Sequence, residues 1–153
     1  MQYAVDPLAD SFEGCTAVVT GGGAGMGREL VIQLAALGCH VATCDLYEDT
    51  VLETMARAAE RAREGVRLSA HAANVADEAQ MNAFAAAVAG QHGAVINLLF
   101  NNAGIGAYGR TPDLDPEVWK RTIEVDLHSV FYGCRAAIPH LMQDRVEPVA
   151  VFG

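Results

Sequence analysis

Apolar residues recur along the chain in two alternating patterns. Short runs rich in β-branched and other apolar residues are separated by longer segments in which apolar residues return every three or four positions. The short runs predict strands at 15–20, 40–45, 66–72, 95–100 and 148–153. The longer segments predict helices at 25–37, 49–64 and 77–91, and a long helix that begins at 115. Because strand and helix alternate throughout, the pattern favours a parallel sheet covered by helices on both faces.

The last predicted helix carries an extended apolar pattern. Asp115 and Pro116 are typical of a helix start, because proline fits the first helical position. One apolar stripe at three- and four-residue spacing is predicted along this helix, formed by Ile123, Leu127, Val130, Phe131, Cys134, Ile138 and Leu141. Pro139 lies inside the pattern and is expected to bend or end the helix.

Composition narrows the class of protein. Of the 153 residues, 52% are hydrophobic and 19% are charged, a composition too apolar for a disordered chain. The length fits one domain over residues 1–153. No apolar run approaches the roughly 18–20 residues that span a bilayer. The first six residues lack the basic and apolar parts of a signal peptide. A cytoplasmic protein is therefore expected.

Charge and cysteine spacing argue against several partners. The net charge is −9 and Lys120 is the single lysine, so nucleic acid and anionic membranes are poor partners. The four cysteines show no C-x-x-C spacing and the histidines no ligand pairing. Neither a disulfide framework nor a metal site is therefore expected.

Five glycines stand where the first strand meets the first helix, at positions 21, 22, 23, 25 and 27. Gly21 permits a sharp turn, and Gly27 lets the helix pack closely on the strand. Between them Gly23, Ala24 and Gly25 let a pyrophosphate approach the backbone, where the helix N-terminus offers free N–H groups. With right-handed crossovers, this turn favours the strand order 3-2-1-4-5.

An acidic residue completes the signal. Asp45 ends the second strand, 20 residues after Gly25, and Leu46 follows it in the same predicted site. A carboxylate there can accept hydrogen bonds from both ribose hydroxyls and would repel a 2′-phosphate, which favours NAD over NADP. Two alternatives stay open: the turn only serves packing, and the aspartate only caps the next helix.

With these residues in place, the chain resembles the short-chain dehydrogenase/reductase family over residues 14–153. Thr20-Gly21-Gly22-Gly23-Ala24-Gly25-Met26-Gly27 matches the family's T-G-x-x-x-G-x-G turn, and Asn101-Asn102-Ala103-Gly104 matches its N-N-A-G element. The resemblance implies a Rossmann-type, doubly wound parallel sheet, here truncated after strand five, and hydride transfer between NAD and an alcohol or carbonyl carbon.

The resemblance also implies further cofactor contacts. Met26 would offer its backbone N–H to the pyrophosphate. Asn74 and Val75 match the family's [D/N]-V step, which addresses adenine, and an asparagine can still accept from the adenine amine. Asn102, Ala103 and Gly104 would line the ribose and nicotinamide side.

The catalytic part of the family pattern is missing. No Tyr-x-x-x-Lys occurs, and the sequence ends within the strand that precedes the family's serine, so no catalytic residue is assigned. Asp126 stands where the family has an asparagine that holds a water in the proton relay. A carboxylate there would disfavour a nearby tyrosinate, or would simply be solvated.

Three interpretations remain. The chain is an NAD-dependent oxidoreductase of this family whose sequence stops early, a non-catalytic NAD-binding module or partner subunit, or a fragment that needs a complementary chain. A short apolar edge strand at 149–152 and an incompletely covered long helix predict association, with a homo-oligomer expected.

Overall fold

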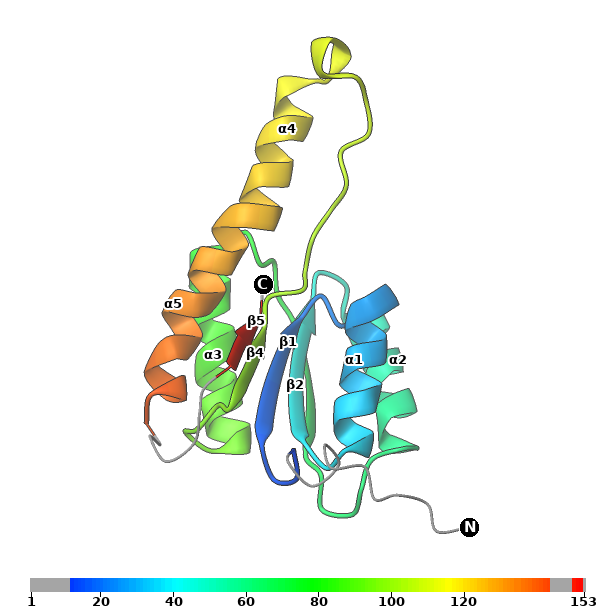
Figure 1. Ribbon diagram of the computed structural model, residues 1–153, viewed down its shortest axis with the longest axis vertical. Helices are drawn as coiled ribbons and strands as arrows, with labels where there is room; N and C mark the ends of the chain where they lie inside the picture. The colour runs from blue at the N-terminus through cyan, green and yellow to red at the C-terminus, as the bar shows by residue number, and fades with distance from the viewer. Residues whose placement is uncertain (1–11, 144–149, 153) are drawn as a thin grey trace.

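The computed structural model describes residues 12–143 and 150–152. Its strands are β1 (Thr16–Thr20), β2 (His40–Asp45), β3 (Leu68–Ala72), β4 (Leu98–Phe100) and β5 (Ala150–Phe152). All paired strands are parallel, and the order β3-β2-β1-β4 is the predicted one. The three residues of β5 pair with β4 at the edge of the sheet (Figure 1). Residues 148, 149 and 153 of the predicted fifth strand lie outside the described residues.

Helices cover both faces of the sheet, as strand–helix alternation predicts (Figure 1). On one face lie α1 (Gly25–Ala36) and α2 (Glu48–Ala59), and on the other α3 (Glu78–His92) and α5 (Ser129–Leu141). Successive residues of β1 supply the two cores in turn: Ala17 and Val19 pack on the α1 side and Val18 on the α3 side. This alternation follows from the two-residue period of a strand.

Two predicted boundaries are wrong by several residues. The second helix ends at Ala59 rather than at 64, because the chain turns so that the Arg63 N–H donates to the Ala35 carbonyl at the end of α1. The fourth strand begins at Leu98 rather than at 95, because the backbone pairing is incomplete at Asn97: its N–H donates to the Thr16 carbonyl at 2.9 Å, but the return bond from Thr16 goes to the Asn97 side chain. Asn97 Oδ1 accepts from the Thr16 N–H at 2.7 Å.

The long helix consists of three consecutive segments: α4 (Pro116–Ile123), the π-helical turn η2 (Glu124–His128) and α5. Asp115 caps its start by accepting from the Glu117 N–H. A 3₁₀ turn, η1 (Thr111–Asp113), precedes it. The helix runs through Pro139 and ends at Leu141, so the proline falls in the last turn and does not stop it earlier.

The predicted apolar stripe on this helix is wrong in part: Leu141 is buried and Cys134 packs against the core, but the stripe as a whole does not face the core. Three of its members, Leu127, Phe131 and Ile138, are 60%, 59% and 40% exposed. The buried row is formed instead by Val125, Ser129, Gly133, Ala137 and Leu141. Small residues in this row let α5 approach the sheet and α3 closely.

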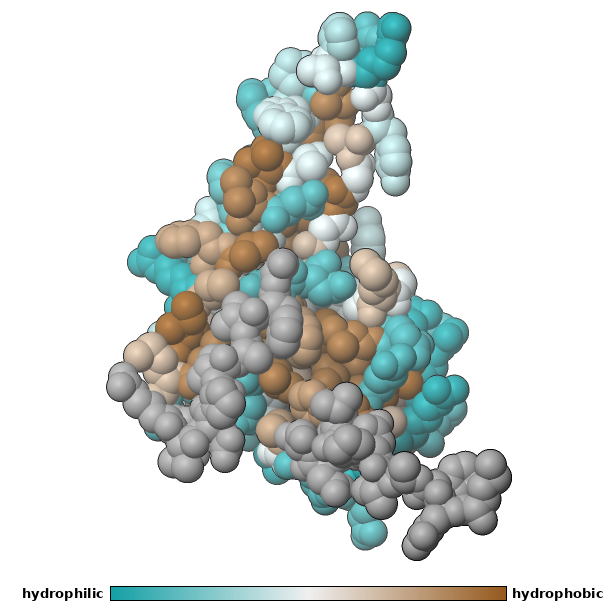
Figure 2. All heavy atoms as spheres, viewed as in Figure 1, coloured by the Kyte–Doolittle hydropathy of each residue, from teal (hydrophilic) through white to brown (hydrophobic). Residues whose placement is uncertain are grey.

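The segment α4 has no buried residue and extends past the sheet (Figure 1). Hydrophobic residues lie on its surface and on that of α5 (Figure 2). Within the described part of the chain, no helix is both long enough and apolar enough to cross a membrane.

Candidate functional site

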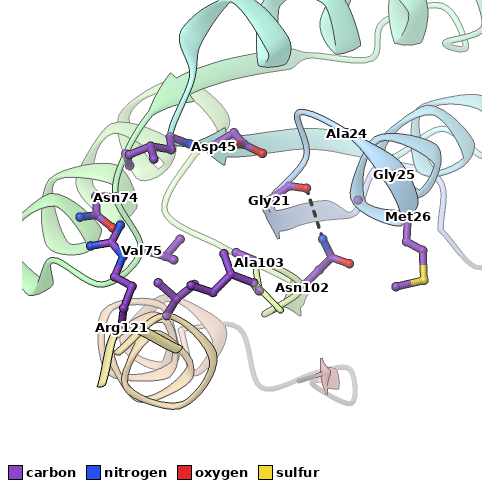
Figure 3. A pocket seen from close by; sticks show the side chains of 16 residues that line it. Gly21, Ala24, Gly25, Met26, Asp45, Asn74, Val75, Asn102, Ala103 and Arg121 are labelled. Carbon is purple, nitrogen blue, oxygen red and sulfur yellow. Dashed lines mark hydrogen bonds between the residues drawn. The ribbon is translucent and has the colours of Figure 1, made fainter. Parts of the chain in front are cut away.

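A cavity of about 360 Å³ lies where the carboxyl ends of the parallel strands meet the glycine turn (Figure 3). Segments that follow each of β1 to β4 line it, together with α4 and η2. All predicted site residues except Gly23 line this cavity, namely Gly21, Ala24, Gly25, Met26, Asp45, Leu46, Asn74, Val75, Asn102, Ala103 and Gly104. In doubly wound sheets, ligands bind at the carboxyl ends of the strands, in the crevice between the two neighbouring strands from which the chain continues in opposite directions across the sheet.

The glycine turn is fixed by backbone contacts. Gly21 has φ +70°, and the N–H groups of Gly21 and Gly22 both donate to the Cys44 carbonyl, at 2.8 and 3.2 Å. A Cβ on Gly27 would collide with the Gly21 carbonyl oxygen and would lie 2.5 Å from the amide nitrogen of Asn102. Both roles predicted for these glycines, the sharp turn and the close packing, are therefore confirmed.

The turn leads directly into the N-terminus of α1 at the cavity. Ala24 precedes the helix in an extended conformation, and no side chain caps this end. A Cβ on Gly25 would meet no atom within 4 Å, so the space beside it is open. Free N–H groups and the positive end of the helix dipole thus face a cavity that an anion can enter.

Asp45 is held by the backbone around it. One carboxylate oxygen accepts from the Gly23 N–H at 2.9 Å and the other from the Leu46 N–H at 2.7 Å. Each carboxylate oxygen can accept two hydrogen bonds, so one position on each oxygen remains for a ligand. A Cβ on Gly23 would collide with Thr50 Oγ1 and would lie 2.8 Å from Asp45 Oδ2, so the carboxylate can come this close only to a glycine.

The end of β4 is tied to the end of β1 by one hydroxyl. Thr20 Oγ1 accepts from the N–H groups of Asn102 and Ala103, both at 3.1 Å. The Asn102 side-chain amide donates to the Thr20 carbonyl at 3.0 Å and to the Gly21 carbonyl at 3.3 Å, and Figure 3 draws the second of these bonds. The amide N–H groups of Asn102 therefore hold the glycine turn, which leaves its Oδ1 and the nearby backbone to face the cavity.

At the end of β3 the Asn74 side chain closes a local turn. Its Oδ1 accepts from the Ala76 N–H at 3.1 Å, while the backbone N–H of Asn74 donates to Gln80 Oε1 at 2.9 Å. The carbonyl oxygen expected to receive the adenine amine thus already has one donor. A second lone pair remains for a ligand.

Asp126 has a role that neither sequence-based alternative described. It lies in the π-helical turn, and its Oδ1 accepts from the Ile105 N–H at 2.8 Å. The carboxylate therefore fastens the loop after β4 to the long helix and is not simply solvated. A π-turn within an α-helix often marks a functional position.

Arg121 was missed by the sequence interpretation. Its side chain lines the cavity and extends toward Asn74 (Figure 3). In the sequence it stands four residues before Val125, which also lines the cavity, and this one-turn spacing is the signal that could have identified it. Arg28 and Thr54 were missed as well, and both contact the glycine turn from outside the cavity.

A second polar cluster lies away from the cavity. Ser69 Oγ is 2.7 Å from His92 Nε2 and 3.1 Å from His71 Nε2. Burial, followed by the nearby charge of Arg67, lowers the pKa of His92 to about 4, and burial also lowers the pKa of His71. These imidazoles are therefore neutral near pH 7 and act as packed hydrogen-bonding groups.

Sequence comparisons find related oxidoreductases. The family profile described as short chain dehydrogenase matches residues 15–150. Cyclohexanol dehydrogenase of Acinetobacter sp. (strain SE19) is 31% identical over 136 residues, covering 88% of this chain and 53% of that protein. 2-(R)-hydroxypropyl-CoM dehydrogenase of Xanthobacter autotrophicus is 38% identical over 132 residues, covering 82% and 50%. "Probable oxidoreductase EphD" of Mycobacterium tuberculosis is 40% identical over 118 residues, covering 77% and 19%.

Solved structures share the fold. A short chain dehydrogenase/reductase from Burkholderia phymatum, in complex with NAD, superposes with a TM-score of 0.83 at 29% sequence identity. The match covers 92% of this chain and 48% of that one. The chain thus spans about half the length of this structure and of the two named dehydrogenases, and a smaller share of EphD.

Proposed function

Because the chain belongs to the short-chain dehydrogenase family, we propose that its cavity binds NAD and that these residues form the cofactor-binding part of an alcohol or carbonyl oxidoreductase. The observation that carries the proposal is the arrangement of Asp45 opposite the glycine turn. Two backbone N–H groups orient its carboxylate at the edge of the cavity and leave an acceptor position on each oxygen. A ribose presents two neighbouring hydroxyl donors, which match that pair of positions.

The rest of the cavity suits the other parts of a dinucleotide. The diphosphate would lie against the N–H groups of Ala24, Gly25 and Met26 at the start of α1, where the dipole favours negative charge. Adenine would lie between Leu46 and Val75, with Asn74 at its edge. The nicotinamide side would be lined by Asn102, Ala103 and Gly104, and bound NAD would supply the hydride acceptor.

The preference for NAD over NADP follows from charge. A 2′-phosphate would have to approach the Asp45 carboxylate, and the repulsion between the two anions disfavours it. Arg28 reaches the glycine turn, but its guanidinium is bound to the Gly23 carbonyl and to Glu53. It is therefore committed to these acceptors and does not neutralise Asp45.

The substrate proposal follows the relatives. Cyclohexanol and the 2-hydroxypropyl group in the names of two relatives are secondary alcohols, so we propose secondary alcohols and ketones as the substrate class. Within these 153 residues no tyrosine is followed four positions later by a lysine. The chain alone is therefore expected to bind the cofactor without turnover, and NADH formation from NAD and cyclohexanol would contradict this.

Self-association is part of the proposal. Trp119, Leu127 and Phe131 are each more than half exposed on the long helix, and an exposed apolar surface of this kind favours a second copy of the chain. Light scattering is expected to give the mass of a dimer or larger species. A monomer at working concentration would contradict it.

The decisive experiment is a fluorescence titration with NADH and NADPH. The parent chain is expected to bind NADH at least about tenfold more tightly than NADPH. Asp45→Ala removes a charge-assisted pair of hydrogen bonds, so the binding free energy of NADH is expected to weaken by about 1–3 kcal/mol. The ratio of the NADPH Kd to the NADH Kd is expected to fall, because the charge that repels the 2′-phosphate is also removed.

Asp49→Ala is the matched control, because Asp49 is an exposed carboxylate in the first turn of α2 that does not line the cavity. Its NADH affinity is expected to equal that of the parent. The proposal is wrong if the parent chain fails to bind NADH or if Asp45→Ala binds it as tightly as the parent does.

A further inference from the structure

Arg28 lies in the first turn of α1, but its side chain turns away from the cavity and contacts the outer side of the glycine turn. Its Nη2 donates to the Gly23 carbonyl, and its Nε donates to Thr54 Oγ1 at 3.1 Å. The same Nη2 lies 3.1 Å from Glu53 Oε2, and the side chain is 20% exposed. The guanidinium thus bridges the turn and α2.

Thr54 acts on the neighbouring peptide. It is fully buried in α2, and the single proton of its hydroxyl is shared between the Gly22 carbonyl at 2.9 Å and the Thr50 carbonyl of its own helix at 3.0 Å. The carbonyls of two consecutive residues of the turn, Gly22 and Gly23, are therefore both held on the α2 side.

The direction of these carbonyls determines where the next N–H groups point. In a planar trans peptide, the carbonyl oxygen and the following N–H point in opposite directions. Because Thr54 holds the Gly22 carbonyl, the Gly23 N–H points the other way and reaches Asp45 Oδ2 at 2.9 Å. By the same geometry, the bond from Arg28 to the Gly23 carbonyl turns the Ala24 N–H away from α2, and Ala24 lines the cavity.

We propose that Arg28 is a positioning residue of the cofactor site, which rests on the proposed function. By holding the Gly23 carbonyl, its guanidinium aims the Ala24 N–H at the site of the diphosphate, and Glu53 and Thr54 hold the guanidinium in place. The planar fork of an arginine can donate to all three acceptors at once, whereas a lysine ammonium on a flexible stem cannot hold the same geometry.

The test compares two ligands that share adenosine and differ in phosphate. ADP carries a diphosphate and adenosine carries none, so only ADP depends on the Ala24 N–H. In the 153-residue chain, Arg28→Ala is expected to raise the Kd of ADP and of NADH about tenfold. The Kd of adenosine, measured by amide chemical-shift titration, is expected to change by less than about twofold.

Arg57→Ala is the matched control. Arg57 pairs with the same Glu53 side chain one turn further along α2, without any bond to the glycine turn. Its affinities for ADP and adenosine are expected to equal those of the parent.

If circular dichroism shows that Arg28→Ala is unfolded, Arg28→Lys decides the question, with an expected threefold or so rise in the ADP Kd and unchanged adenosine binding. Equal losses for ADP and adenosine in a folded variant, or no loss for either, would overturn the inference. A parent chain that binds neither ADP nor NADH would instead overturn the proposed function itself.

Discussion

Two walls of different construction face each other across the cavity. The glycine wall, residues 20–28, is held through its own backbone groups: its N–H groups donate to the Cys44 carbonyl, and its carbonyls accept from the side chains of Thr54 and Arg28. The helix wall is formed by Arg121 and Val125 with the loop that Asp126 fastens at Ile105. Its α4 segment has no buried residue.

The difference shows how each wall keeps its shape. Hydrogen bonds from β2, α2 and the end of β4 hold the glycine wall on several sides, so its shape is fixed before any ligand arrives. The helix wall depends on a few side-chain contacts, and its α4 segment is not packed into the core. Substitutions should therefore be costly on the first wall and mild on the second.

The largest effect is expected for Gly27→Ala. The added methyl group would collide with the Gly21 carbonyl, and neither backbone can move without breaking the bonds to Cys44. We expect a loss of about 3 kcal/mol in the free energy of unfolding, measured by urea denaturation. Gly90→Ala is the control, because this exposed helical position has no atom within 4 Å of an added Cβ. A Gly27→Ala chain as stable as Gly90→Ala would refute the rigid wall.

A smaller effect is expected for Gly133→Ala, which makes the matching change behind the helix wall. Here the added methyl group would collide with the side-chain oxygen of Asn101, which has no hydrogen-bond partner, so the side chain can shift at the expense only of the weak bond from its amide to Cys134 Sγ at 3.5 Å. Alanine also gains about 1 kcal/mol of helix propensity over glycine. The net loss is expected to be about 1 kcal/mol in the same denaturation experiment. If Gly133→Ala lost as much free energy of unfolding as Gly27→Ala, the two walls would not differ in rigidity.

The smallest effect is expected for Asp126→Ala. This change removes the exposed bond to the Ile105 N–H, and the loss of stability is expected to stay below about 1 kcal/mol. Hydrogen exchange at the Ile105 amide should accelerate in Asp126→Ala and stay at the parent rate in Asp126→Asn, which keeps an acceptor oxygen. Equal acceleration in both variants would show that charge, not the hydrogen bond, holds the loop.

The glycine wall could be predicted from sequence because its shape requires particular residue types. Gly21 adopts a positive φ, and Gly27 leaves no room for a side chain, so glycine is required at both positions. Asp45 was found because it ends a strand at a fixed distance from the turn. The strand order followed from the same features, since each connection between parallel strands is right-handed.

The helix wall could not be predicted as well, because two faces of the long helix fit helical spacing. Hydrophobicity selects the face with Leu127 and Phe131, whereas close packing selects the face with Ser129 and Gly133. Arg28 and Thr54 were missed for a related reason: they meet across 26 residues of sequence, and no local motif joins them.

The bond between Gly23 and Asp45 also limits how the proposed preference for NAD over NADP can be redesigned. Replacing Asp45 to admit a phosphorylated ribose would remove the acceptor of the hydrogen bond from the Gly23 N–H. The turn would then lose this bond together with the carboxylate charge that repels the phosphate. A single exchange should consequently weaken both forms of the cofactor, and a true reversal would require a new acceptor for that amide in the same step.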